Sequence, residues 1–264
     1  MGNRLTMSPK SPSIACLAVD IGNTSVAIAR WQNGKVTRTA HIDGGIRRAP
    51  EACEQAILKA AKGGVNGVCI ASVVPKVNAR WKTLIRRTLG CAPLFVTAAL
   101  PLPLDIDYPK PETIGADRLA DAVGAIRRYG APALIADFGT ALTFDLVTSK
   151  NTYIGGVITP GIPLMTDYLH EKTAQLPQVS LNQPCSGVGR STEEAIRIGA
   201  RIGYRGLIRE IAAHLAHETK EDFHLIATGG YAKWVLAESG LPFTIDPDLT
   251  LYGIGAIFAF QTTR

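Results

Sequence analysis

Blocks of apolar and polar residues alternate near the start of the chain. Residues 14–19 are apolar, residues 20–24 form the polar segment Asp-Ile-Gly-Asn-Thr, and residues 26–31 are largely apolar. An Asn33-Gly34 pair follows, which is a strong hairpin signal beside apolar runs. This order predicts a strand, a polar turn, a second strand and a hairpin turn.

The middle of the chain repeats this pattern. Residues 133–136 are apolar, residues 137–141 form the turn Asp-Phe-Gly-Thr-Ala, and residues 142–147 are again largely apolar. Each passage therefore places an aspartate directly after a strand and a glycine two positions later. The repetition predicts two related α/β halves, each with one carboxylate in its first turn.

Strand and helix patterns alternate along the rest of the chain. Residues 68–74 and 224–227 are largely apolar and predict strands. The spacing of apolar residues predicts helices at residues 51–62, 77–89, 113–129 and 191–217. Strands that alternate with helices favour an α/β fold.

The composition is that of a folded protein from a reducing compartment. Of the 264 residues, 46% are hydrophobic and 19% are charged, which is enough apolar surface for a core. No run of 18 apolar residues predicts a membrane span, and the first dozen residues lack the apolar centre of a secretory signal. The five cysteines form no C-x-x-C pair. We therefore expect a cytoplasmic protein with free thiols.

The net charge of +6 fits anionic small molecules as well as nucleic acid. The basic residues occur as separate pairs without interleaved aromatic residues, so nucleic-acid binding is the weaker interpretation. The motifs for a P-loop, a dinucleotide fold, a nucleophile elbow and a zinc protease are all absent from the sequence.

The two aspartate turns carry the clearest chemical signal. Glycine lets backbone N–H groups approach a phosphate, Asn and Thr add hydrogen bonds, and a carboxylate can hold hydrated Mg²⁺. Each turn alone is also explained by the conformational preferences of Asp, Gly and Asn. Because the turn occurs twice, we favour a clamp around the phosphates of a nucleotide. The small-residue turn Thr228-Gly229-Gly230 fits either nucleotide contact or a tight connection.

Asp117 and Arg118 stand in the first turn of the helix predicted at residues 113–129. The helix dipole favours an aspartate there, so capping is the simple explanation of Asp117. Arg118 opposes the dipole and requires an anionic partner, for which a substrate carboxylate is one candidate.

Taken together and in order, these segments resemble the type III pantothenate kinases of the actin-like, sugar kinase and Hsp70 superfamily. The resemblance covers nearly the whole chain from Ile14 onward. It rests on the following segments: DIGNT at 20–24, ASVVP at 71–75, residues 108–118 with GADR at 115–118, DFGTA at 137–141, GG at 155–156, PG at 160–161, T-x-E-x-I at 192–196 and TGG at 228–230.

The resemblance implies ATP-dependent phosphorylation of pantothenate at its 4′-hydroxyl, the first step of coenzyme A biosynthesis. It implies Mg²⁺ with the ATP, a monovalent cation (K⁺ or NH₄⁺), and a homodimer. It further implies two RNase H-like domains at residues 14–125 and 126–264, with the nucleotide cleft between them and residues 1–13 as an extension.

The resemblance also assigns roles to individual residues. It assigns the ATP phosphates to Asp20, Ile21, Gly22, Asn23, Thr24, Ser25, Val26, Ala27 and Thr140. It assigns pantothenate to Tyr108, Gly115, Ala116, Asp117, Arg118 and Thr192, with Asp117 as general base, and the monovalent cation to Asp137. The family often has a basic or polar residue at the position of Ala27, so only backbone contact is expected there.

Two other functions remain open at this stage. An actin-like fold also suits a nucleotide-binding regulator without kinase activity, since fold does not fix function. A kinase for a different small hydroxylated acid would use the same nucleotide clamp. Asp117 argues against the first, and a panel of acceptors would decide the second.

Overall fold

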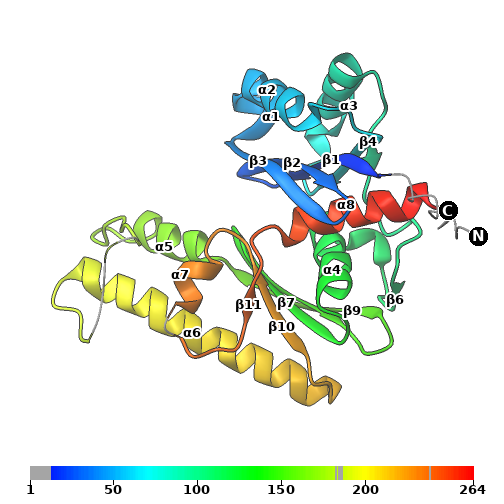
Figure 1. Cartoon of the computed structure of the whole chain (residues 1–264). Coiled ribbons are helices and arrows are strands. Elements are labelled where there is room, and N and C mark those ends of the chain that lie inside the picture. Colours follow the sequence, from blue (N-terminus) through cyan, green and yellow to red (C-terminus); the bar gives the residue numbers. More distant parts are fainter. Residues whose placement is uncertain (1–12, 182, 184–186, 238) are drawn as a thin grey trace, which may run out of the picture.

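The computed structural model describes residues 13–181, 183, 187–237 and 239–264. Two mixed β-sheets lie one above the other, with helices outside each sheet and two helices between them (Figure 1). Nearly all of the extension expected at residues 1–13 lies outside the described residues, as does Cys185. No helix in the described part of the chain is both long and apolar enough to cross a membrane.

The first sheet is built from the first half of the chain and has the strand order β3-β2-β1-β4-β5. Its strands are β1 (Ala15–Ile21), β2 (Ser25–Gln32), β3 (Lys35–Asp43), β4 (Gly67–Ser72) and β5 (Leu94–Phe95). β1 pairs antiparallel with β2 and parallel with β4. The predicted strand, turn and hairpin are confirmed.

The second sheet repeats the order of the first and adds one strand. Its strands are β7 (Ala133–Phe138), β8 (Ala141–Val147), β9 (Thr152–Pro160), β10 (His224–Thr228), β11 (Thr244–Ile245) and the added β6 (Asp105–Ile106). The order β11-β10-β7-β8-β9-β6 places the strands of the second half around β7 as those of the first half lie around β1. The prediction of two related α/β halves is therefore confirmed.

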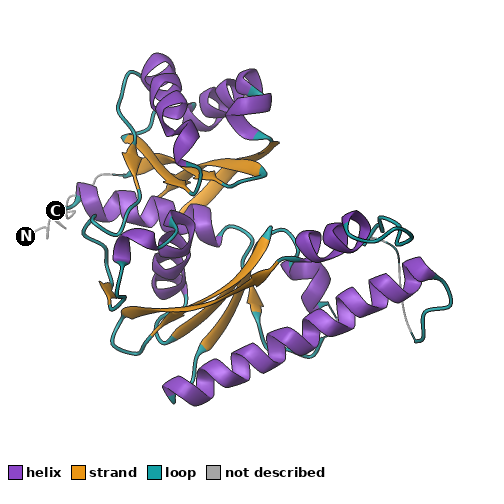
Figure 2. Ribbon diagram, turned by 180° about the vertical axis from the view of Figure 1, so that it is seen from behind, coloured by secondary structure: helices purple, strands orange, loops and turns teal. Residues whose placement is uncertain are grey.

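The outer helices cover the two far faces of the sheets (Figure 2). The first sheet carries α1 (Gly45–Arg48), α2 (Pro50–Ala61) and α3 (Pro75–Leu89), and the second carries α5 (Ile162–Glu171), α6 (Thr192–Thr219) and α7 (Ala232–Leu236). α3 buries Val77, Trp81, Leu84 and Ile85, which is the spacing of one helical face. α6 begins after Ser191, whose side chain accepts a hydrogen bond from the Glu194 N–H.

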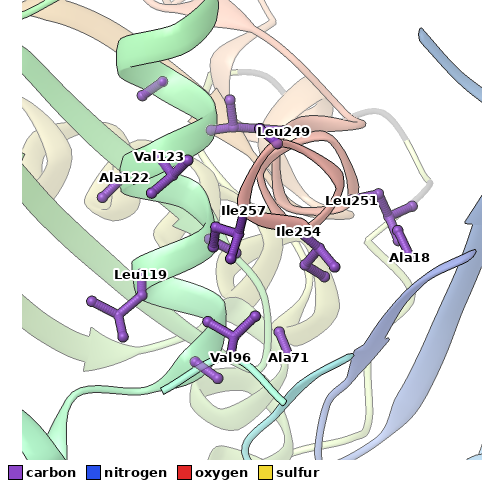
Figure 3. Close-up of a cluster of buried hydrophobic side chains, with 14 of the residues drawn as sticks. Ala18, Ala71, Val96, Leu119, Ala122, Val123, Leu249, Leu251, Ile254 and Ile257 are labelled. Atoms are coloured by element: carbon purple, nitrogen blue, oxygen red, sulfur yellow. The ribbon is translucent and has the colours of Figure 1, made fainter. Parts of the chain in front are cut away.

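Helices α4 (Ala116–Arg128) and α8 (Leu249–Thr262) lie between the two sheets (Figure 1). Buried apolar side chains of both helices, among them Leu119, Val123 and Ile257, lie close together there (Figure 3). α8 packs against β1, β2 and β4, whereas α4 packs against β7 and β8 as well as β4. The 3-10 turn η1 (Pro111–Thr113) leads into α4. The domain boundary expected after residue 125 falls inside α4, and the division of the chain there stays a prediction.

The two central helices cross at glycines. A Cβ atom on Gly253 of α8 would lie 1.8 Å from the carbonyl oxygen of Ala120 in α4. A Cβ atom on Gly124 would lie 2.8 Å from the carbonyl oxygen of Leu249. Only residues without a side chain permit this approach, so these glycines set the distance between the inner helices.

Candidate active site

Strand alternation places the two turn aspartates on facing sides of the sheets. Along β1, Leu17 and Val19 point to the outer helices, whereas Ala18 and Asp20 belong to the inner face. Along β7, Ile135 and Asp137 likewise share the inner face. Both carboxylates are thus directed toward the region between the sheets, which the α4 and α8 helices also border.

A cavity of about 370 Å³ lies at this place and is lined by both halves of the chain. The first half contributes Asp20, Gly22, Asn23, Thr24, Ser25, Ala27, His41, Val73 and Asp117, and the second contributes Asp137, Gly139, Thr140, Ala141, Thr143, Gly229, Gly230, Pro247, Thr250 and Leu251. Hereafter this cavity is called the cleft. Both repeated turns meet in it, as the two copies of the motif predicted.

Each turn is closed by its own backbone, and the two touch across the cleft. The N–H of Gly22 donates to the carbonyl of Ser25 at 3.0 Å, and the N–H of Gly139 donates to that of Ala141 at 3.1 Å. The hydroxyls of Thr24 and Thr140 lie 3.3 Å apart. The polar ends of the two loops are therefore close enough to grip one group from both sides.

Glycine is required where the third small-residue turn meets the second loop. Gly229 has a φ of +88°, and a Cβ atom there would lie 2.4 Å from Oδ1 of Asp137. The N–H of Tyr231 donates to the carbonyl of Phe138 at 3.2 Å, which fixes this turn on the end of β7. The turn at residues 228–230 thus belongs to the cleft.

Three carboxyl groups share the cleft and perturb one another. Burial, together with the charges of Asp117 and Asp137, raises the pKa of Asp20 to about 8. Burial raises the pKa of Asp137 to about 7, with Asp117 and Asp145 contributing. A cation bound among these groups would favour their ionised forms, so the cleft is chemically suited to one.

The carboxylates of the cleft suit a cation that also binds water or phosphate oxygens. Within the described ranges, no three acidic, histidine or cysteine side chains are arranged to enclose a metal ion alone. Mg²⁺ at phosphoryl-transfer sites is held by one or two carboxylates together with water and phosphate oxygens. Asp20 and Asp137, each in a turn that contains one glycine and lines the cleft, match that kind of site.

Asp117 lines the cleft from the first turn of α4. One of its carboxylate oxygens, Oδ1, accepts a hydrogen bond from the N–H of Arg118 at 2.8 Å. A Cβ atom on Gly115, the N-cap of the helix, would lie 2.4 Å from this oxygen. Burial raises the pKa of Asp117, while the hydrogen bond from Arg118 and its positive charge oppose the increase. Asp117 therefore both accepts a hydrogen bond in the first turn of the helix and lines the cleft.

The guanidinium of Arg118 binds a carboxylate within the protein. Its Nε and Nη2 atoms lie 2.8 and 2.7 Å from Oδ1 of Asp145. The hydroxyl of Tyr153 donates to the same oxygen at 2.7 Å. The ring of Tyr108 lies 6.3 Å from that of Tyr153, and Gly155 makes room for it. The side chains of Tyr108 and Arg118 thus form a cluster beside the cleft rather than part of its lining.

Sequence reasoning missed Asp145 and Tyr153. An aspartate in the apolar strand at residues 142–147 is the signal that could have found the first, because a buried carboxylate needs a partner. Tyr153 carries no comparable signal, since its role depends on the register of β8 and β9. The cleft residues His41, Pro247 and Thr250 were not anticipated either.

Other candidates lie away from the cleft. Ile21 and Val26 are buried in the core beneath α2 and α3, so only their backbone can reach a ligand. Thr192 is exposed at the start of α6 and lines a separate hollow of about 350 Å³ between α5 and α6. Within one chain, Thr192 is therefore not brought to the other candidate residues.

Comparison with known proteins identifies relatives of this chain and agrees with its fold. A type III pantothenate kinase from Methylacidiphilum infernorum is 38% identical over 244 residues, covering 91% of this chain and 87% of that protein. A Campylobacter jejuni protein assigned to the Baf family of transcriptional activators superposes with a TM-score of 0.60 at 19% identity, covering 94% of this chain and 100% of that one. A ROK family glucokinase from Streptomyces griseus gives 0.55 at 15% identity, covering 93% and 99%.

The two superpositions are too distant in sequence to show more than the fold, which is the two-domain ATPase fold expected from the sequence. The model of the type III pantothenate kinase family matches residues 16–214. This match spans both aspartate turns, the start of α4 and most of α6. The chain accordingly belongs to the type III pantothenate kinase family.

Proposed function

We propose that this protein transfers the γ-phosphoryl group of ATP to the 4′-hydroxyl of pantothenate, the first step of coenzyme A biosynthesis. The observation that carries the proposal is the convergence of both aspartate turns and Asp117 on one cleft, in a chain of this family. A likeness to a transcriptional activator at 19% identity shows only a shared fold, so it does not favour a regulatory role.

The turn loops suit the phosphates of ATP. Gly22 and Gly139 lie at the ends of β1 and β7 without side chains that would fill the cleft, and Thr24 and Thr140 add hydroxyl donors from opposite sides. Ala27 offers no charged group, so phosphate contact there uses the backbone. When bound, Mg²⁺ neutralises charge on the transferring phosphoryl group. The protein contributes position and fixed dipoles, which account for most catalysis in phosphoryl transfer.

Asp117 is the group best placed to accept the proton of the acceptor hydroxyl. It lines the cleft beside the phosphate loops, and burial brings its pKa closer to neutrality, where a general base is most effective. Pantothenate is proposed to lie along the start of α4, at residues 115–118, next to Tyr108. An assay of ADP release with and without pantothenate tests the function, and a panel of other hydroxylated acids tests the choice of acceptor.

Replacement of Gly115 by Ala is expected to lower turnover about tenfold. The new Cβ atom would overlap Oδ1 of Asp117 at 2.4 Å, so the carboxylate must move away from its position in the cleft. Gly203→Ala is the control, because Gly203 on α6 has free space for a Cβ atom. Gly130→Ala would be a poor control, because Gly130 has a φ of +88°. Steady-state kinetics of both variants decide the matter: wild-type turnover in Gly115→Ala would mean that Asp117 need not hold this position.

We expect turnover to depend on K⁺ or NH₄⁺ and expect Asp137→Ala to weaken that dependence. Asp137 is buried and its pKa is raised to about 7 by burial and by neighbouring carboxylates, so an added cation would relieve repulsion there. Rates measured in matched Na⁺ and K⁺ buffers provide the test, with Asp105→Ala as the control, because Asp105 is an exposed carboxylate in strand β6. Equal wild-type rates in the two buffers would exclude this cation role.

A homodimer is the expected form in solution. Thr192 is remote from the cleft of its own chain, so a contact between Thr192 and pantothenate requires a second copy. Exposed apolar residues on β9, α5 and α6 offer a surface for that copy: Ile158, Leu164, Tyr168 and Ile202. Sedimentation at micromolar concentration should give twice the mass of the chain, and charged substitution of Ile202 should reduce it. A monomer mass for the unaltered protein would contradict the prediction.

The cytoplasm is the proposed location. The described cysteines Cys16, Cys53, Cys69 and Cys91 are all free thiols, which suits a reducing compartment.

A further inference from the structure

Asp145 is a buried charge in the middle of an apolar strand. Its neighbours in β8, Phe144 and Leu146, face the core under the outer helices, whereas Asp145 faces inward toward α4. It is fully buried. Burial of an unpaired carboxylate lowers the stability of the fold. The groups paired with Asp145 therefore indicate which elements it fixes in place.

The partners of Asp145 come from three elements. Oδ1 accepts from Nε and Nη2 of Arg118 in α4 and from the hydroxyl of Tyr153 in β9. Oδ2 accepts from the hydroxyl of Thr143 in β8 at 3.2 Å. The Arg118 side chain is only 12% exposed. The ion pair therefore ties the first turn of α4 to the second sheet.

Arg118 is also the residue whose backbone holds Asp117. The N–H of Arg118 donates to Oδ1 of Asp117, so any movement of Arg118 displaces this hydrogen bond and the carboxylate with it. An arginine near a helix N-terminus is opposed by the helix dipole and would turn outward without an anionic partner. Asp145 of β8 is that partner.

We propose that Asp145 is a positioning residue that acts through Arg118: their ion pair fixes the first turn of α4 on β8 and thereby holds Asp117 in the cleft. This proposal rests on the proposed function, because it concerns the general base. It assigns the guanidinium of Arg118 an internal task. Consistent with this, Asp117 lines the cleft but the side chain of Arg118 does not.

The opposite end of α4 provides a matched control. There Arg128 forms an ion pair with Asp246, and the hydroxyl of Tyr129 donates to Asp246 at 2.9 Å. This cluster also joins one arginine, one aspartate and one tyrosine, and Asp246 is buried. It lies about 16 Å along the helix from Asp117. Loss of its charge should weaken the fold without moving the base.

The first experiment compares Asp145→Asn with Asp246→Asn. Turnover, the KM for ATP and the melting temperature are measured with pantothenate and with its alcohol analogue panthenol, which lacks the carboxylate. For Asp145→Asn we expect kcat to fall about 10- to 100-fold with both acceptors and the KM for ATP to stay unchanged. For Asp246→Asn we expect a lower melting temperature and a kcat within about twofold of the wild type, since the base is not displaced.

The second experiment places Asp145→Asn in an Asp117→Asn background. If Asp145 acts by positioning Asp117, the added substitution should lower turnover by less than about threefold, because the group it positions is already gone. Should Asp145→Asn fail to fold, Tyr153→Phe removes one hydrogen bond to Asp145 and keeps the ring. That variant should lower kcat in the same direction by a smaller factor.

Three results would overturn the proposal. These are an unchanged kcat in folded Asp145→Asn, a full additional loss in the Asp117→Asn background, and a loss confined to pantothenate. The last result would mean that Arg118 recognises the substrate carboxylate. A wild-type protein without pantothenate-dependent ADP release would contradict the proposed function and the positioning role together, whereas an active wild type with an equally active Asp145→Asn would contradict the positioning role alone.

Discussion

Replacement of Asp117 by Asn is expected to lower turnover about 10²- to 10⁴-fold while nucleotide affinity stays close to that of the wild type. Asn has the same size and can still accept the hydrogen bond from the N–H of Arg118, so the helix start should remain intact. It cannot take up the proton of the acceptor hydroxyl. The phosphate loops do not include Asp117, so ATP retains its contacts there.

Calorimetry with nucleotide and turnover on the same preparation separate these two effects. Glu112→Gln is a suitable control, because Glu112 is an exposed carboxylate in η1 just before the same helix. It should keep wild-type turnover. If Asp117→Asn stays within about threefold of the wild type, well inside the range for a general base, Asp117 only caps the helix and the base lies elsewhere.

The repeated part of the fold was predictable because its signal is local. Each half begins with two apolar strands around an Asp-x-Gly turn, and strand alternation then fixes which side each aspartate faces. This reasoning led to both carboxylates and to both turns that line the cleft. The turn at residues 228–230 left two explanations open, and the close approach of Gly229 to Asp137 now connects it to the cleft.

The remainder of the site depends on pairings between distant segments. The helix predicted at residues 113–129 gave no indication that its arginine would meet Asp145, because that contact follows from how α4 lies on β8. Thr192 is the opposite case, a residue that was expected at the site but lies away from it. It stands at a good helix start, but the position of α6 carries it away from the cleft.

The neighbours of α8 could not be predicted from sequence patterns either. Residues 249–262 are apolar around most of the helix, which indicates burial on several sides but does not name the neighbours. In the structure, one side meets the first sheet and another meets α4. The last helix of the chain therefore covers the sheet built by its first residues, a long-range pairing that no local period encodes.

The crossing of α4 and α8 leads to the prediction with the largest effect on stability. Gly253→Val is expected to lower the free energy of unfolding by about 3 kcal/mol, since the added atoms must displace the α4 backbone. The first of them alone would lie 1.8 Å from the carbonyl oxygen of Ala120. For a chain of this size, such a loss corresponds to a fall in melting temperature of about 10 °C.

Gly203→Ala is the matched control, because Gly203 lies in α6 with free space for a Cβ atom. A glycine in a helix interior costs about 1 kcal/mol relative to alanine, so this substitution should raise the melting temperature slightly. Thermal unfolding of both variants, followed by circular dichroism, gives the comparison. Since α4 carries Asp117, Gly253→Val should also lower turnover in whatever fraction remains folded. An unchanged melting temperature in Gly253→Val would show that α4 and α8 can separate without loss of the fold, and that their contact does not hold the two sheets together.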